Sequence, residues 1–251
     1  MTDLDKQSSV EFLAAYCEEY NVPIHFLREI LTDQKVIPMI RGKAMEYNAF
    51  LRLKDILPKN TWSVQKLNLN AQPGYYDEDI GIVHRRTGTL LKVESKSAMR
   101  GSFTSGKRCK IMRDVPHFKI KCHRSRSNIQ LLETSNDRYS VDSFDLLLST
   151  PENSLYKKGS ISEHFEICTS PDLQKILYGY YRVNDEKDLI LASRNDWRFA
   201  IPNTIAENGY IPRTPYVQLS HDPHWHPMRE LEPCLLEIVK EKRKNASASR
   251  R

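Results

Sequence analysis

Two carboxylates and a lysine stand close together in one segment of this 251-residue chain. Asp79 precedes the apolar run 80–83, and Glu94 and Lys96 flank a serine at the end of a second, alternating run. Carboxylate oxygens are ligands that a hard cation such as Mg²⁺ prefers. Such a cation polarises a phosphate and lowers the pKa of a bound water, and a neighbouring ammonium group can orient that water. These residue types therefore favour metal-assisted phosphodiester hydrolysis.

The two runs predict a β-hairpin that would position these groups. Because side chains alternate along a strand, Glu94 and Lys96 fall on the same face. A turn centred on residues 86–87 places Asp79 opposite Glu94, whereas a turn centred on 87–88 places it opposite Lys96. Opposed residues share a face, so either register brings the three side chains onto one surface. The alternative is an ordinary surface hairpin in which this spacing is a coincidence.

Positive charge is concentrated directly after this hairpin. The chain has 38 Lys and Arg against 32 Asp and Glu, a net charge of +6. Residues 100–126 hold nine Lys or Arg residues and one acidic residue, so this segment alone has a net charge of +8. Such a segment beside a metal site indicates phosphate-backbone binding, although a solvated loop without a partner is the alternative. The bases are Arg100, Lys107, Arg108, Lys110, Arg113, Lys119, Lys121, Arg124 and Arg126.

Three residues at the end of this segment are candidates for reading DNA bases. Arginine binds guanine and asparagine binds adenine in a bidentate way, which suits Arg124, Arg126 and Asn128. Contact with phosphates is an equally open role for them. The small donors around them, such as Ser125 and Ser127, are also suited to phosphate oxygens.

Composition restricts the class of protein. No apolar run approaches the 18 residues of a membrane span, and the first residues lack a secretory signal, so we expect no membrane partner. The five cysteines are widely spaced, without a C-x-x-C pair, and indicate reduced thiols. A cytoplasmic protein is the expectation. A histidine-rich segment, residues 220–226, is interpreted as a rigid loop, with a zinc site as the weaker alternative.

Hydrophobic periodicity predicts a mixed α/β organisation. Expected helices cover residues 8–20, 23–31, 38–57 and 231–242, and expected strands cover 62–69, 117–122, 142–148 and 188–192. Residues 197–216 are interpreted as structured loop. Glu46 lies on the third helix, either as a solvated carboxylate or turned towards the metal site. The expected parts are an N-terminal helical segment (1–36), a catalytic core (37–150), a C-terminal part packed on that core for recognition or dimerisation (151–242), and a disordered basic tail (243–251).

This order of elements resembles the PD-(D/E)xK nuclease superfamily and, within it, the type II restriction endonucleases. The resemblance covers residues 40–149 and is carried best by Glu94-Ser95-Lys96. It implies a mixed central sheet flanked by helices. The family's proline is missing before Asp79, where Glu78 stands instead, and this leaves Asp77 as a rival metal ligand.

The resemblance also implies roles for single residues. Asp79 and Glu94 would bind Mg²⁺, Lys96 would position the attacking water, and Glu46 would be an accessory acid. Family members cut double-stranded DNA, commonly as homodimers on a short palindromic site, and a restriction enzyme implies a companion DNA methyltransferase. Another nuclease of the superfamily, such as a junction resolvase or a repair or defence nuclease, is the alternative. A non-catalytic DNA-binding protein is the rival from a different class.

Overall fold

The computed structural model describes residues 3–67, 78–104, 115–124, 137–158, 165–167 and 170–248. The chain divides into two compact units, Met1–Ala44 and Met45–Arg251. Of the residues singled out above, Asp77, Lys107, Arg108, Lys110, Arg113, Arg126 and Asn128 lie outside the described residues.

The larger unit is built around a six-stranded mixed sheet in the order β1-β2-β3-β5-β8-β10. Neighbouring strands are antiparallel except β3 and β5, which are parallel. The predicted mixed α/β fold, a central sheet flanked by helices, is therefore confirmed. The strands are β1 (Trp62–Lys66), β2 (Ile80–His84), β3 (Thr89–Ser95), β5 (Leu146–Ser149), β8 (Arg198–Ala200) and β10 (His226–Pro227).

The hairpin β2–β3 adopts the first of the two predicted registers. Ile80 pairs with Val93 and His84 pairs with Thr89, so the turn centres on residues 86–87. The αL conformation needed to close this turn falls on Gly88, with φ of 68°, where a residue without Cβ is not strained. Continued by one residue, this register sets Asp79 opposite Glu94.

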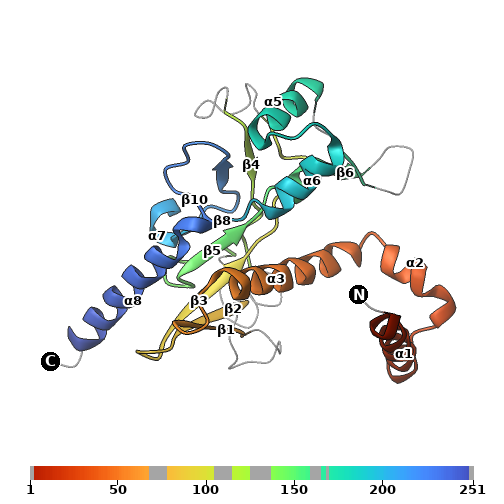
Figure 1. Ribbon diagram of the computed structural model, residues 1–251, viewed down its shortest axis with the longest axis horizontal. Coiled ribbons are helices and arrows are strands. Elements are labelled where there is room, and N and C mark those ends of the chain that lie inside the picture. Colours follow the sequence, from red (N-terminus) through yellow and green to blue (C-terminus); the bar gives the residue numbers. More distant parts are fainter. Residues whose placement is uncertain are drawn as a thin grey trace. The chain divides into compact units, whose positions relative to one another are not determined.

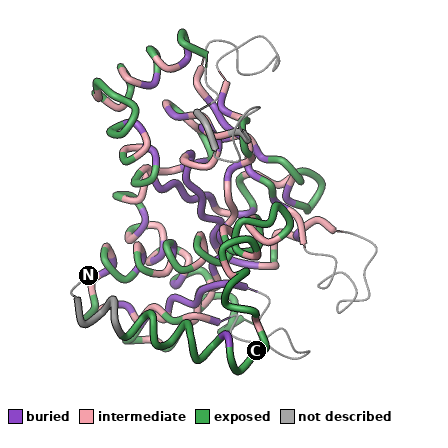
Figure 2. The backbone as a smooth tube through the Cα atoms, turned by 90° about the vertical axis from the view of Figure 1, so that its right-hand side faces the viewer, coloured by how far each residue is buried: buried purple, intermediate pink, exposed green. Residues whose placement is uncertain are grey.

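Helices cover the sheet through two separate apolar clusters. On one face, α3 (Ile37–Ile56) contributes Ala49 and Leu53, and α8 (Leu231–Ala248) packs beside them against β2, β3 and β5 (Figure 1). The second cluster joins Leu147 and Ala200 of the sheet to helices α5 (Pro171–Tyr181) and α6 (Glu186–Asn195). Buried residues accordingly gather along the strands (Figure 2). Burial of this apolar surface is the main force that holds the hairpin in place.

Short elements complete the unit. They comprise two small ribbons, β4 (His117–Lys119) with β9 (Tyr216–Gln218) and β6 (Tyr156–Lys158) with β7 (Phe165–Ile167), together with the 3₁₀ turns η2 (Glu152–Leu155) and η3 (Met228–Glu230) and helix α7 (Pro202–Ile205). Strand β4 is shorter than the predicted strand 117–122, and it pairs with β9 rather than with the main sheet.

The smaller unit contains α1 (Asp3–Glu19), η1 (Ile24–Phe26), α2 (Leu27–Thr32) and the beginning of α3. Along α1, the exposed rings of Phe12, Tyr16 and Tyr20 follow one side, with neighbouring centroids 6.3 and 4.7 Å apart. The helix begins at Asp3, before the predicted start at residue 8. Among the helices that the structure describes, none combines the length and the apolar composition needed to cross a bilayer.

Two local predictions in the C-terminal part are wrong. The run 188–192 is helical within α6, because Asp185 caps that helix by accepting a hydrogen bond from the amide of Asp188 at 2.8 Å. The region interpreted as loop, 197–216, contains β8, whose residues are buried in the main sheet between β5 and β10. The C-terminal part therefore completes the central sheet as well as packing on it.

The last helix extends into the region expected to be a disordered tail. Helix α8 continues through Ala248, beyond the predicted end at residue 242. Lys242 anchors this end, because its ammonium group donates to Asp145 at 2.7 Å and to the carbonyl of Leu90 at 3.3 Å. The helix thus continues for six residues beyond the ion pair that joins it to the segment before β5.

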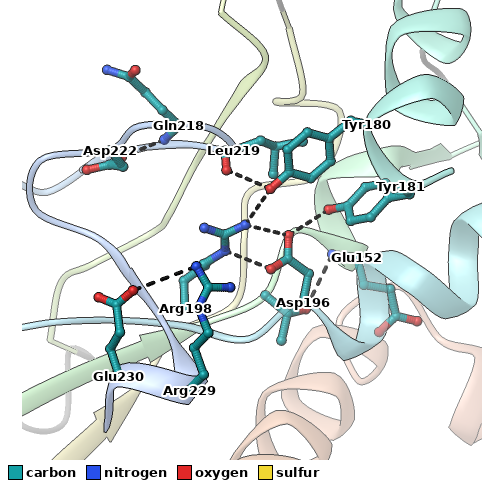
Figure 3. Close-up of polar contacts among 11 residues, drawn as sticks. Glu152, Tyr180, Tyr181, Asp196, Arg198, Gln218, Leu219, Asp222, Arg229 and Glu230 are labelled. Atoms are coloured by element: carbon teal, nitrogen blue, oxygen red, sulfur yellow. Dashed lines mark hydrogen bonds and ion pairs between the residues drawn. The ribbon is translucent and has the colours of Figure 1, made fainter. Parts of the chain in front are cut away.

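A second polar cluster, centred on Arg198, has a structural role (Figure 3). The guanidinium group of Arg198 donates to both carboxylate oxygens of Asp196, at 2.7 and 3.1 Å, and to the hydroxyl of Tyr180 at 2.7 Å. Tyr180 in turn donates to the carbonyl of Leu219, and Tyr181 donates to Asp196. Burial, reinforced by Asp196, raises the pKa of Tyr181 well above its usual value. This cluster connects α5 to β8 and to the segment after β9.

Candidate active site

The three residues with the predicted chemistry meet at the end of the β2–β3 hairpin. Asp79 directly precedes β2, and Glu94 lies near the end of β3. Both carboxylates are buried, with Asp79 5% and Glu94 2% exposed. Lys96 directly follows β3, and its amide donates to the carbonyl of Leu148 at 2.9 Å. Strands at the centre of the sheet therefore hold these groups on a rigid backbone.

The side chain of Asp79 is oriented by its neighbour across the hairpin. The amide and the hydroxyl of Ser95 both donate to Oδ2 of Asp79, each at 2.8 Å. Burial raises the pKa of Asp79, and the negative charge of Glu46 raises it further. The positive charge of Lys96 and the two hydrogen bonds from Ser95 act in the opposite direction. A buried carboxylate with a raised pKa gains from a cation, because the cation replaces the lost hydration.

Glu94 is held by two donors. Lys96 forms a short ion pair with Oε1 of Glu94, and the hydroxyl of Tyr139 donates to the same oxygen at 3.1 Å. The ring of Tyr139 also contacts two cations, with Nζ of Lys96 5.2 Å and Cζ of Arg124 4.8 Å from its centroid. Sequence reasoning missed Tyr139, because it lies 45 residues away from Glu94 in the chain and belongs to no motif.

Lys96 is positively charged at neutral pH. Burial by itself would lower the pKa of Lys96, but the negative charges of Glu94 and Asp79 and the hydrogen bond to Glu94 outweigh it, so the pKa lies well above the usual value. Lys96 is therefore suited to donate hydrogen bonds and to stabilise negative charge, and not to accept a proton. The buried thiol of Cys122 also lies within reach of these charges, and burial raises its pKa to about 12, which leaves it protonated.

Glu46 reaches the same region from helix α3, as the resemblance implies. Its Oε2 atom lies 3.3 Å from Nζ of Lys66, at the end of β1, and both side chains are largely buried. The charge of Glu46 is close enough to raise the pKa of Asp79. Lys66 is not part of the motif that carries the family resemblance. It comes close to Asp79 in the fold because β1 pairs with β2.

The donor set suits a hard cation that keeps several waters. Across the described ranges, no three His, Cys, Asp or Glu side chains come together as a ready-made metal cage. The protein offers two carboxylates, Asp79 and Glu94, while Glu46 is held by Lys66. Mg²⁺ is commonly bound by one or two carboxylates, with waters and substrate phosphates in the remaining positions. The buried carboxylates therefore fit Mg²⁺ better than they fit zinc, which prefers nitrogen and sulfur ligands.

Two described parts of the basic segment, residues 100–104 and 115–124, lie next to the end of β3. The amide of Met99 donates to the carbonyl of Lys119 at 2.7 Å, and the amide of Lys121 donates to the carbonyl of Ser97 at 3.4 Å. These hydrogen bonds bring the basic residues Lys119 and Lys121 beside the end of β3. Lys121 and Arg100 are exposed, whereas Lys119 lies over the ring of Tyr216 at 5.1 Å.

Arg124 is engaged within the protein. Its guanidinium group donates to the carbonyl of Arg138 at 2.9 Å and to the hydroxyl of Ser143 at 3.1 Å. A direct contact with a base would require it to leave these partners. The structure thus places Arg124 as a support for Tyr139, and the DNA contact expected from the sequence stays a prediction.

The histidine-rich segment is stabilised by one aspartate. The carboxylate of Asp222 accepts hydrogen bonds from the amides of Gln218, His224 and Trp225, at 2.7–2.9 Å. His221 has a φ of 54°, as a tight turn requires. Because Asp222 is used in this way, the segment has the structure of a capped loop.

Replacing Tyr139 with phenylalanine tests how strongly Glu94 depends on its second donor. The variant keeps the ring that contacts Lys96 and Arg124 but removes the hydrogen bond to the buried carboxylate. Loss of such a bond to a charged group is expected to reduce the free energy of unfolding by about 1.5–3 kcal/mol. Urea denaturation of both proteins measures the difference. An unchanged midpoint would show that the hydroxyl contributes nothing to holding Glu94.

Comparisons with known proteins give little further information. No protein-family model matches the chain, and no curated protein matches it. Among solved structures, the chain is similar to a bacterial homing endonuclease, I-Ssp6803I, with a TM-score of 0.27 and 20% sequence identity. The match covers 45% of this chain and 60% of that enzyme's chain, which is less than two thirds of its length. A likeness of this degree assigns neither a fold family nor an activity to the chain.

Proposed function

We propose that this protein is a Mg²⁺-dependent nuclease that hydrolyses phosphodiester bonds of double-stranded DNA. One observation carries the proposal: two buried carboxylates from adjacent strands, Asp79 and Glu94, lie within the electrostatic reach of one protonated lysine, Lys96. Buried charges are costly unless they are paired or bind a metal, so this cluster in a sheet is a candidate functional site. The basic segment beside the site supports DNA as the substrate.

The side chains divide the chemistry between them. Asp79 and Glu94 would hold a Mg²⁺ ion, which supplies charge neutralisation at the scissile phosphate and lowers the pKa of a water. Ser95 fixes the carboxylate of Asp79, and Tyr139 fixes that of Glu94. Lys96, as a charged donor, orients the attacking water and stabilises the negative charge that develops at phosphorus. No nucleophilic side chain of the protein is needed: a water would attack phosphorus in line, the bond from phosphorus to the leaving oxygen would break, and the proton of the water would pass to solvent.

Within this activity, we favour a type II restriction endonuclease on the basis of the family resemblance. Such an enzyme would act as a homodimer on a short palindromic site, with a companion methyltransferase to protect the host. The expected DNA contacts come from the Lys and Arg side chains of residues 100–126 and from Asn128. The C-terminal part, which contributes β8 and β10 to the sheet, provides chain beyond the minimal catalytic core, as site-specific enzymes often do.

Incubation of the purified protein with unmethylated phage DNA tests the proposal. The reaction is run with Mg²⁺ and with EDTA, and the products are separated on a gel. Discrete bands that need Mg²⁺ are the expected result, and run-off sequencing would then identify the site. A Mg²⁺-dependent smear would retain the nuclease but reject site-specific cleavage. Intact DNA with every divalent metal, together with a band shift, would reject catalysis and leave a DNA-binding protein.

A further inference from the structure

Arg213 is a positively charged residue close to the candidate active site that lies outside the basic segment. It comes just before β9, in the region interpreted from the sequence as structured loop. Its Nε and Nη2 atoms lie 2.7 and 2.6 Å from Oδ1 of Asp137, so two of its five N–H donors contact one carboxylate oxygen. The side chain of Arg213 is nevertheless 62% exposed. An ion pair this exposed contributes little to stability, so stability alone does not account for the arrangement.

Two short segments place Arg213 in the fold. Residues 137–141 run antiparallel to residues 209–213. The amide of Ile211 donates to the carbonyl of Tyr139 at 2.8 Å, and the register sets these two residues opposite each other. Both side chains are buried. The segment that contains Arg213 is therefore paired with the segment that contains Tyr139.

The same register sets Arg213 opposite Asp137, two residues from Tyr139. Opposed residues share a face of a ladder, and so do residues two apart on one strand, so Arg213, Asp137 and Tyr139 lie on one face. On that face, the hydroxyl of Tyr139 donates to Glu94 at 3.1 Å, and the centroid of its ring lies 5.2 Å from Nζ of Lys96. The backbone of Arg213 is thus two strand residues, roughly 7 Å along the strand, from the level of Tyr139.

A second arginine, Arg124, flanks the same ring. Its Cζ atom lies 4.8 Å from the centroid of Tyr139, and its amide donates to the carbonyl of Asp137 at 2.8 Å. The amide of Cys122 in turn donates to the carbonyl of Arg213 at 2.8 Å, so the end of the basic segment adjoins Arg213. The guanidinium group of Arg124 donates to groups inside the protein, whereas that of Arg213 is exposed. Of the two, Arg213 is the one that a ligand can reach directly.

We propose that Arg213, oriented by Asp137, binds a phosphate of the DNA strand next to the one that is cleaved. This inference rests on the proposed nuclease function. A planar guanidinium group matches the oxygens of a phosphate. A carboxylate that already holds this group reduces the conformational freedom that is lost on binding. Because Asp137 contacts only Nε and one N–H of Nη2, the remaining donors of Arg213 are available to the phosphate.

The affinity of the full-length protein for a short DNA duplex tests this assignment. Fluorescence anisotropy is measured in EDTA, so that the DNA stays intact, over a series of salt concentrations. Arg213→Gln is expected to weaken binding about tenfold or more. It is also expected to reduce the slope of log affinity against log salt concentration by about 0.9, the change for one phosphate contact. Unchanged affinity and slope in a folded Arg213→Gln protein would overturn the inference.

A double variant distinguishes a phosphate contact from simple neutralisation of Asp137. Arg213→Gln with Asp137→Asn replaces the ion pair by two neutral side chains, so no unpaired carboxylate is left to repel DNA or to destabilise the fold. If Arg213 contacts a phosphate, the double variant still binds DNA about tenfold more weakly than the wild type, with the reduced slope. Recovery of wild-type affinity would show that Arg213 only neutralises Asp137 and would reject its assigned role.

Arg194 provides the matched control. Its Nε and Nη2 atoms lie 3.0 and 2.8 Å from Oε1 of Glu152, and its side chain is 55% exposed. This ion pair joins α6 to η2 and does not involve the segment of Tyr139. Arg194→Gln removes the same charge from a similar pair, and its DNA affinity is expected to stay within about threefold of the wild type. An equal loss in the two variants would indicate a general effect of charge and would contradict the inference.

Cleavage with Mg²⁺ separates this inference from the proposed function. If the wild type cleaves DNA and Arg213→Gln binds DNA with wild-type affinity, the nuclease stands and the inference alone fails. If the wild type neither binds nor cleaves DNA, the proposed function is wrong, and the inference falls with it. The two failures are therefore distinguishable with the same proteins and the same DNA.

Discussion

Replacing Lys96 with methionine is expected to slow DNA cleavage by about 10²–10⁴-fold, while affinity for DNA stays within about threefold of the wild-type value. Methionine keeps most of the apolar stem and removes only the ammonium group. That group contacts Glu94, and its charge acts on Asp79, so it lies where the water would be oriented. Single-turnover cleavage under saturating Mg²⁺ and a band-shift assay measure the two quantities separately.

Lys92→Met is the matched control. Lys92 lies on the same strand as Glu94, and its ammonium group forms an ion pair with Glu78 at 2.7 Å. The Lys92→Met substitution removes the same charge as Lys96→Met but leaves Lys96 in place. We therefore expect a cleavage rate close to that of the wild type. Equal losses in the two variants would point to a general effect of charge or stability. Near-wild-type cleavage by Lys96→Met would remove Lys96 from the mechanism.

Asp79→Asn is expected to abolish cleavage and cation binding, and yet to make the metal-free protein more stable at neutral pH. Asparagine can still accept the hydrogen bonds from Ser95, but it carries no charge to bury or to oppose Glu46. Each kcal/mol recovered corresponds to an increase in Tm of about 2–4 °C for a chain of this size. Thermal unfolding in EDTA measures this gain, and cleavage assays measure the loss.

The pH dependence of the stability difference between Asp79→Asn and the wild type tests whether burial of the Asp79 charge is its cause. The pKa of Asp79 is raised in the folded protein above its ordinary value of 3.8, mainly by burial. The folded state therefore disfavours the charged carboxylate, and the cost is fully present above the folded-state pKa. It disappears as the pH falls through that pKa towards 3.8, because both states are then protonated. The stability gain of Asp79→Asn should vanish over the same range.

Glu78→Gln serves as the control for this variant. Glu78 precedes Asp79 and is also buried, but its carboxylate pairs with Lys92. Its replacement removes an ion pair instead of a disfavoured charge, so cleavage should persist and no gain in stability should appear. A stability gain of the same size in Glu78→Gln would show that the effect belongs to acidic residues of this segment in general.

Several elements were predictable because their signals are local. The extent of α3, which ends just before Pro58, and the alternation along β3 are each encoded in a few neighbouring residues, although α3 buries Ala49 and Leu53 while the apolar residues Tyr47 and Leu51 are exposed. The pairing of β2 with β3 follows from a short turn that joins two adjacent strands. For the same reason the placement of Glu94 beside Asp79 could be expected, since neighbouring strands of one hairpin carry both.

Other elements depended on contacts that no local pattern records. The residues of β8 were interpreted as loop, because a three-residue strand between β5 and β10 becomes recognisable only once its partners are in place. The run within α6 has a composition compatible with a strand, and its cap at Asp185 determines that it is helical. Intrinsic propensity is a weak signal over such short lengths, and tertiary context overrides it.

The sequence by itself determined which groups are candidates for the site, because the residue types at 79, 94 and 96 and the hairpin that carries them are local properties of the chain. Only the tertiary structure decided how those groups are held. Tyr139 reaches Glu94 across 45 residues, and Lys66 reaches Glu46 across 20. These partners are set by the stacking of strands and helices, whose free energy comes from apolar burial that is distributed over the whole sheet. The sequence therefore predicts the candidate groups, and the fold determines their partners and orientation.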